Sequence, residues 1–337
     1  MRALLEKRNS IYGACAIWIV LFHTFRRISM PYIPIVTNIV SIGNLAVDVF
    51  FFFSGLCLSL SAGKHNYQKT GWRPYFKKRL SRVLLPYLLI GIPYYIWAAV
   101  CETSGSVLRR GAAFLADLSS ASFWLKGMQT TWFVYGILLF YTLFPAIYSF
   151  VKRSGSGKKI AFLFGLILFA VAAAYTPVLK NSMIVWARLP VFSIGVMAGT
   201  LPEQDKVPGK GPTAAAALLV VLLGWLTSLS ELSESFTIPA MYKLLLFLPL
   251  SLSLLMLLSR FGKRVRFLEW AGGLSLEIYL VHITLLHPLK YYGIMEALGC
   301  WLYICLPAAA LLLAWIVGEI EKNIRKRGEK HESLQHL

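Results

Sequence analysis

Ionisable side chains inside long apolar stretches are the first residues in this sequence that could do chemistry. A charge near the centre of a bilayer costs a few kcal/mol or more, so such residues are functional candidates by default. The candidates that interrupt the apolar runs are His23, Asp48, Arg188, Glu277, His282 and His287. His23 is the strongest of them, because an imidazole is the usual general acid or base near neutral pH. We interpret His287 as a packed histidine that makes one hydrogen bond.

The rise of an α-helix predicts that four of these side chains lie in one layer of the membrane. At about 1.5 Å per residue, His23 and His282 lie roughly 20 Å from the cytoplasmic ends of their helices. Asp48 and Arg188 enter from the other face and reach about the same depth in a core about 30 Å thick. We therefore expect a shared polar layer in the outer half of the bilayer, in which Asp48 and Arg188 form either a functional or a structural pair.

Membrane-spanning helices must position this layer. The chain has 337 residues, of which 57% are apolar and 15% charged, and its mean hydropathy is +0.64. Soluble domains average about a quarter charged residues, so an ordinary soluble protein is excluded. Apolar runs of spanning length predict an all-α membrane protein with about ten transmembrane helices. The expected spans are about residues 10–28, 43–62, 83–100, 129–150, 160–176, 183–200, 213–230, 244–259, 270–289 and 299–317.

The positive charge indicates how these helices are oriented. Lysine and arginine total 34 against 15 acidic residues, a net charge of +19, and most of them fall in alternate connections. By the positive-inside rule, this predicts both termini in the cytoplasm of a multi-pass protein of the cell (inner or plasma) membrane. Charge that alternates with apolar runs indicates topology, so we expect no nucleic-acid partner. We divide the chain into one membrane domain, 1–318, and a charged cytoplasmic tail, 319–337.

Two further features limit the function. The first apolar run is followed by no small-residue cleavage site, so we expect a retained helix and not a signal peptide. Five cysteines show no paired spacing, metal motif or disulfide framework. We expect no metal site and, separately, no permanently bound cofactor. The outside segment 101–128 is long enough for a short interfacial helix or a lid.

Five separated segments resemble the acyltransferase 3 family of membrane acyltransferases. They are IYGACAIWIVLFHT (11–24), GNLAVDVFFFFSGLCLSLS (43–61), YFKKRLSRVLLPY (75–87), TWFVYGILLFYTLFP (131–145) and AGGLSLEIYLVHITLLHPL (271–289). Each match is weak alone, but they occur in the family's order. The matching motif residues are His23, Asp48, Ser54, Arg79, Arg82, Trp132, Ser275, Tyr279 and His282. Two positions depart from the family pattern, which usually has arginine where this chain has Tyr12 and often glutamate where it has Ile137. Arg8 lies one turn before Tyr12, about 60° around the helix from His23, so it can serve the same cavity.

The resemblance implies transfer of an acyl group, usually acetyl, from cytoplasmic acyl-CoA to a hydroxyl of a cell-envelope carbohydrate or its lipid-linked precursor. The donor, the acceptor and the lipid bilayer are then the partners, and the oligomeric state, including a homo-oligomer, is left open. Arg79 and Arg82 share one helix face and suit the donor's phosphates, although positive-inside anchoring is the alternative. Ser54 either hydrogen-bonds the thioester or packs.

The same resemblance suggests roles around the reacting groups. We expect His23 to act as the general base for the acceptor hydroxyl, with nucleophilic catalysis by His23 as the alternative. Asp48 either orients that imidazole or pairs with Arg188. On the acceptor side we place Arg188, His282 and Trp132, and Trp132 either stacks on a sugar ring or anchors its helix at the interface. The alternative function is a transporter or flippase for a lipid-linked sugar.

Overall fold

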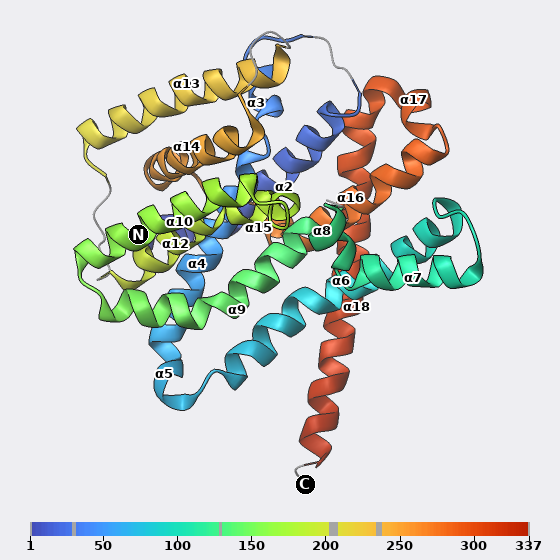
Figure 1. The fold of residues 1–337 in the computed structure, drawn as a ribbon, viewed down its shortest axis with the longest axis horizontal. Coiled ribbons are helices and arrows are strands. Elements are labelled where there is room, and N and C mark those ends of the chain that lie inside the picture. Colours follow the sequence, from blue (N-terminus) through green and yellow to red (C-terminus); the bar gives the residue numbers. More distant parts are fainter. Residues whose placement is uncertain (1, 29–31, 128–129, 202–207, 234–237, 336–337) are drawn as a thin grey trace.

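In the computed structural model the chain is described over residues 2–28, 32–127, 130–201, 208–233 and 238–335, and these parts contain helices and no strand (Figure 1). The α-helices are α1 (Arg2–Glu6), α2 (Arg8–Phe25), α3 (Val36–Ser41), α4 (Leu45–His65), α5 (Tyr67–Thr70), α6 (Arg73–Cys101), α7 (Val107–Leu118), α8 (Ala121–Lys126), α9 (Trp132–Arg153), α10 (Ser156–Tyr175), α11 (Met183–Trp186), α12 (Leu189–Thr200), α13 (Lys210–Leu232), α14 (Ala240–Phe261), α15 (Arg266–Gly273), α16 (Ser275–Tyr291), α17 (Ile294–Leu298) and α18 (Leu302–Gln335). The all-helical class is therefore confirmed.

The number of candidate spans is smaller than the sequence predicts. Within the described residues, eight helical segments are long and apolar enough to cross a membrane. The first and ninth expected spans correspond to α2 and α16, which have 18 and 17 residues and are not among those eight. α16 is too short, and polar residues such as Arg8 and His23 lower the mean hydropathy of α2. The polar side chains that mark α2 as a candidate site helix thus also lower the mean hydropathy by which a membrane span is identified.

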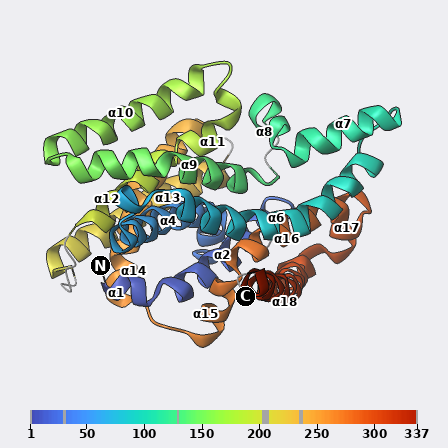
Figure 2. The ribbon, with the colours of Figure 1, turned by 90° about the horizontal axis from the view of Figure 1, so that it is seen from below.

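The helices pack in layers around α4. Seen from below, α4 and α6 lie between α9 and α10 on one side and α2 and α15 on the other (Figure 2). Every residue of α4 from Leu45 to Phe53 is buried, so this helix forms the centre of the bundle. Its partners at the centre include α2, α9 and α12.

Glycines bring two helix pairs unusually close together. A Cβ atom on Gly195 of α12 would lie 2.1 Å from the carbonyl oxygen of Phe52 in α4. A Cβ atom on Gly272 of α15 would lie 1.9 Å from the carbonyl oxygen of Asn9 in α2. Small residues allow helix backbones in a membrane to approach closely, where packing rather than water drives association. These crossings fix how α2 and α4 are rotated about their axes.

Two helices are interrupted next to expected site residues. The segment from Met183 breaks at Ala187 and Arg188, and α12 restarts with Pro190 in its first turn. A second break at Leu274 separates α15 from α16. At the other end of the chain, α18 continues without interruption to Gln335, so the expected boundary at residue 318 falls inside a helix.

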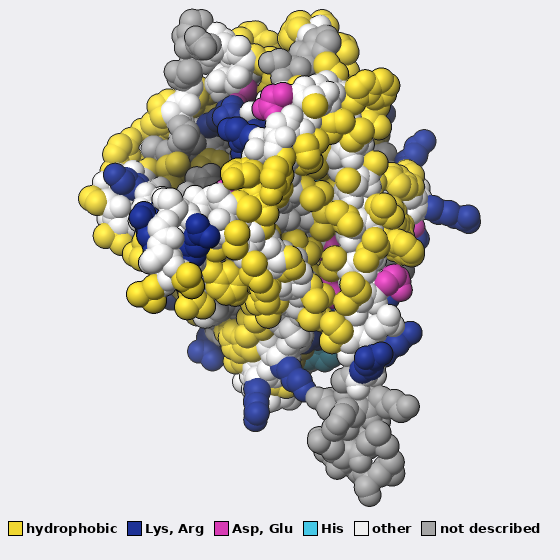
Figure 3. Space-filling view, turned by 90° about the vertical axis from the view of Figure 1, so that its right-hand side faces the viewer, with side chains coloured by type: hydrophobic (Ala, Val, Ile, Leu, Met, Phe, Trp, Pro, Cys, Tyr) yellow, Lys and Arg dark blue, Asp and Glu magenta, His cyan; other side chains and the backbone are white. Residues whose placement is uncertain are grey.

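The outer surface matches a lipid environment. In the face seen in Figure 3, hydrophobic side chains cover the middle, while lysines and arginines lie mainly toward the margins. α10 and α13 expose large apolar side chains such as Phe164 and Val221. The chain is therefore a multi-pass membrane protein whose charged residues gather outside the apolar belt.

The glycine crossing predicts a specific loss of stability. Gly195→Ala should lower the temperature of unfolding in detergent by several degrees, because the added Cβ overlaps the Phe52 carbonyl, and such overpacking costs about 1–3 kcal/mol. Gly165→Ala is the matched control, since its Cβ meets nothing within 4 Å and alanine is the better helix former. Equal unfolding temperatures for the two variants would contradict the close approach of α4 and α12.

Candidate functional site

A cavity of about 200 Å³ lies among α2, α4, α6, α9 and the α15–α16 segment. Its polar lining consists of Arg8, Asn9, Tyr12, Ser54, Cys57, Arg79, Arg82, Tyr141, Ser275 and Tyr279. Three arginines therefore face one cavity, and no acidic residue of the described chain lines it. The guanidinium groups of arginine suit an anionic ligand such as a phosphate. The cavity brings together Arg8, Arg79, Arg82 and Ser54, which the sequence placed on three separate helices.

Arg8 occupies the cavity beside Tyr12. Its Nη1 donates to the Sγ of Cys57 at 3.6 Å, and its guanidinium carbon lies 5.9 Å from the centre of the Tyr12 ring. Arg8 therefore reaches the same cavity as Arg79 and Arg82, one turn away from the usual family position. Cys57 is a cavity residue that was not predicted from the sequence. Its spacing of three residues from Ser54 on α4 was the available signal.

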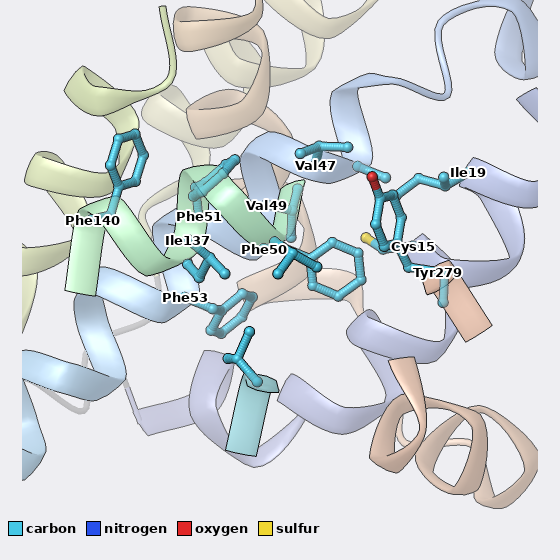
Figure 4. Packing of buried hydrophobic residues seen from close by; sticks show 14 of the residues in the cluster. Cys15, Ile19, Val47, Val49, Phe50, Phe51, Phe53, Ile137, Phe140 and Tyr279 are labelled. Carbon is cyan, nitrogen blue, oxygen red and sulfur yellow. The ribbon is translucent and has the colours of Figure 1, made fainter. Parts of the chain in front are cut away.

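Apolar and aromatic side chains form the rest of the cavity wall. Phe50 of α4 and Ile137 of α9 line it, and Figure 4 shows Tyr279 close to Ile19 and Val47. Among the lining residues of α2, Ile19 lies furthest from Arg8, about 16 Å along the helix axis. Ile137 makes the wall apolar where many family members carry a glutamate.

The two candidate histidines lie in contact beside this end of the cavity. His23 follows Ile19 by one helical turn, and its Nδ1 lies 3.0 Å from the Ile19 carbonyl oxygen and 3.1 Å from the Nε2 of His282. The Nδ1 of His282, which is fully buried, lies 3.0 Å from the carbonyl oxygen of Ile278. The Tyr279 ring, which lines the cavity, lies 5.6 Å from the His282 ring. The two histidines that were predicted to lie at similar depth are therefore in direct contact.

The partners of the two imidazoles assign their tautomers. A carbonyl oxygen only accepts, so the Nδ1 of His282 carries a proton and its Nε2 is left as an acceptor. The Nδ1 of His23 likewise carries a proton, which it shares between the Ile19 carbonyl and the Nε2 of His282. The Nε2 of His23 then has a free lone pair, and it has no hydrogen-bond partner among the described residues. This atom is the free basic nitrogen of the pair.

Asp48, Arg188 and Trp132 form a separate buried cluster. The Nε of Arg188 lies 3.4 Å from the Oδ2 of Asp48, and its guanidinium carbon lies 4.9 Å from the centre of the Trp132 ring. The other guanidinium nitrogens donate to the Ile184 carbonyl at 2.9 Å and to the Asn44 side chain at 3.1 Å. None of the cluster lines the cavity, and within the described chain no hydrogen bond joins Asp48 to His23.

The expected polar layer therefore consists of two pairs and not one site. Aromatic contacts connect them, because the Phe133 ring lies 5.2 Å from Tyr279 and 6.3 Å from Trp132. Trp132 is buried, so its position does not support the alternative in which it stacks on a sugar, and Arg188 is also enclosed. His287 lies elsewhere, with its Nδ1 2.6 Å from the hydroxyl of Tyr94, as expected for a packed histidine with one hydrogen bond.

Comparisons with known proteins agree with this arrangement. A family model described as an acyltransferase domain matches residues 13–319. The chain is also 30% identical over 123 residues to the acyltransferase MdmB of Streptomyces mycarofaciens, a match that covers 34% of this chain and 31% of that protein. No solved structure matches the chain. Because the family model covers most of the chain, this membrane protein belongs to the acyltransferase 3 family.

Proposed function

We propose that this protein is an O-acyltransferase that moves an acyl group, expected to be acetyl, from cytoplasmic acyl-CoA to a carbohydrate. The acceptor is a hydroxyl of a cell-envelope carbohydrate or of its lipid-linked precursor. The observation behind this proposal is that one cavity has arginines at one end and a histidine with a free basic nitrogen beside the other.

The arginine end of the cavity suits the donor. Acyl-CoA is a polyanion, and the guanidinium groups of Arg8, Arg79 and Arg82 offer planar forks for its phosphate oxygens. The long pantetheine arm then extends along α2 and carries the thioester toward Ile19. Ser54 lines the same cavity, and its hydroxyl is the donor we assign to the thioester carbonyl oxygen.

The histidine end suits the transfer step. In the proposed reaction, the Nε2 of His23 takes the proton of the acceptor hydroxyl while that oxygen attacks the thioester carbonyl carbon. The new C–O bond forms, the C–S bond breaks, and the proton passes from His23 to the departing CoA thiolate. The Nε2 of His282 accepts a hydrogen bond from the Nδ1–H of His23. This contact holds the productive tautomer of His23 and stabilises the transient imidazolium.

A second chemical route uses the same nitrogen as a nucleophile. His23 would first take the acyl group from CoA and then pass it to the acceptor. Labelled protein that accumulates with labelled donor in the absence of acceptor would indicate this route. The direct route leaves no label on the protein.

The buried ion pair receives a structural role in this proposal. Arg188 lies at the break before α12, and its contacts to Asp48 and Asn44 join that break to the start of α4. A buried charge without its partner is strongly destabilising, so these residues hold the two helices in place. Trp132 covers the guanidinium group from α9.

Donor binding distinguishes this function from transport of a lipid-linked sugar. CoA should raise the temperature of unfolding of the purified protein, because a ligand that binds only the folded state stabilises it. Arg79→Gln and Arg82→Gln should each weaken CoA binding about tenfold or more, since a charge-assisted hydrogen bond contributes about 1.5–3 kcal/mol. Lys78→Gln is the control, because this exposed lysine lies on the same helix outside the cavity. A wild-type protein that CoA does not stabilise would favour the transporter.

The histidine contact predicts a change in turnover without a change in donor binding. His282→Gln should lower kcat about ten- to hundredfold, because the imidazolium of His23 loses a charge-assisted hydrogen bond. CoA affinity should stay as in the wild type, since His282 does not line the cavity. The measurement is release of CoA from acyl-CoA in membranes that contain the acceptor. His65→Gln, an exposed histidine at the end of α4, should keep full activity. An unchanged kcat for His282→Gln would remove this residue from the mechanism.

A further inference from the structure

The helix α7 is attached to the bundle in an unusual way. It follows the span α6 after a short connection and lies at the edge of the bundle (Figures 1 and 2). None of its twelve residues is buried. The sequence allows either an interfacial helix or a lid in this segment, and the contacts of α7 distinguish the two.

One side of α7 is apolar and faces away from the protein. At 100° per residue, Val107, Leu108 and Leu115 lie within one arc, and Arg109 and Arg110 lie outside it. The three apolar residues are 87%, 84% and 63% exposed. Such an exposed stripe on a helix is typical of contact with a partner or a membrane surface.

The stripe follows, along the chain, an exposed apolar face of the candidate span α6. On the preceding span α6, Ile92, Ile96 and Val100 recur every four residues and are all exposed. They form one apolar face of a candidate membrane-spanning helix, and α7 follows that face after residue 106. Lipid is the occupant that explains both surfaces at once.

Hydrogen bonds hold α7 in a fixed position. The last carbonyl groups of a helix lack partners within it. Here the hydroxyl of Tyr135 donates to the Asp117 carbonyl at 2.9 Å, and that of Tyr87 donates to the Leu118 carbonyl at 2.7 Å. Tyr87 and Tyr135 also lie 3.0 Å apart, and Thr131 donates to Tyr135 at 2.7 Å. We call Tyr87, Tyr95, Thr131 and Tyr135 the tyrosine cluster, in which Tyr95 lies 3.0 Å from Tyr135.

We propose that α7 is an interfacial helix that binds the phospholipid bilayer and that the tyrosine cluster sets its depth. Val107, Leu108 and Leu115 enter the acyl-chain region. Arg109, which is exposed, points to the headgroup side, where phosphate is available as the partner of its guanidinium group.

A fluorescent label tests the position of α7 in the full-length protein in proteoliposomes. The environment-sensitive dye NBD is attached to Leu108→Cys or to the control Arg109→Cys, with the exposed Cys300 and Cys305 replaced by serine. Nitroxide groups on the lipid acyl chains should quench the label at 108 severalfold more than the label at 109. Aqueous iodide should show the opposite order. Iodide quenching at both positions would overturn the proposal, and so would a label at 108 that neither quencher reaches, because protein would then cover the stripe.

Tyr135→Phe tests the role of the tyrosine cluster separately. The variant keeps the ring and loses the hydroxyl that donates to the Asp117 carbonyl. Lipid quenching of the label at 108 should fall, because the end of α7 is no longer held. The unfolding temperature, measured in parallel, shows whether the bundle itself is intact. Unchanged quenching in a folded variant would show that the tyrosine cluster does not set the depth of α7.

Discussion

The central constraint in this protein is that a polar group inside a membrane must find its partner within the protein. No water in the hydrocarbon region can take the place of a missing hydrogen bond or counter-charge. The structure meets this requirement with two pairs, His23 with His282 and Asp48 with Arg188. The first pair joins α2 to α16, and the second joins α4 to the broken segment before α12. These contacts, together with the glycine crossings, determine how the central helices are rotated.

The cavity differs from the rest of the bundle because polar groups in and beside it are available to a ligand. Three arginines line it, and its lining includes no acidic residue of the described chain. The Nε2 of His23 likewise has no hydrogen-bond partner in the part of the chain that the structure describes, whereas its Nδ1 has two. Polar groups that are held in place but still lack a hydrogen-bond partner are preorganised to bind a substrate. Such electrostatic preorganisation is usually the largest contribution to catalysis. The physical requirement that stabilises the bundle therefore also identifies the groups we assign to the reaction.

Much of this arrangement could be predicted from the sequence. Apolar runs predicted the all-helical membrane fold, and charge in these runs pointed to His23, His282, Asp48 and Arg188. Depth along a helix could be estimated from its rise, but rotation about its axis could not, because packing at Gly195 and Gly272 decides it. The four side chains predicted to share one layer therefore form two separate pairs, which depth alone could not predict.

The remaining differences have related causes. Trp132 was predicted near the outer membrane interface, where tryptophan is common, and its packing against the guanidinium group of Arg188 could not be predicted. Arg8 and Cys57 are 49 residues apart in the sequence, and their contact joins α2 to α4. A local sequence pattern cannot predict such a contact. The expected spans at α2 and α16 were counted by their apolar stretches, whereas their length and polar content place them below the other eight.

The account depends most on His23 as the base of the transfer step. The most direct test is transfer of a radiolabelled acyl group from acyl-CoA to the glycan fraction of membranes that hold His23→Gln in place of the wild type. We predict that transfer is abolished while folded protein and stabilisation by CoA are retained, because the side chain lies beside the cavity and not in its wall. Transfer at the wild-type rate by the His23→Gln protein would contradict the account.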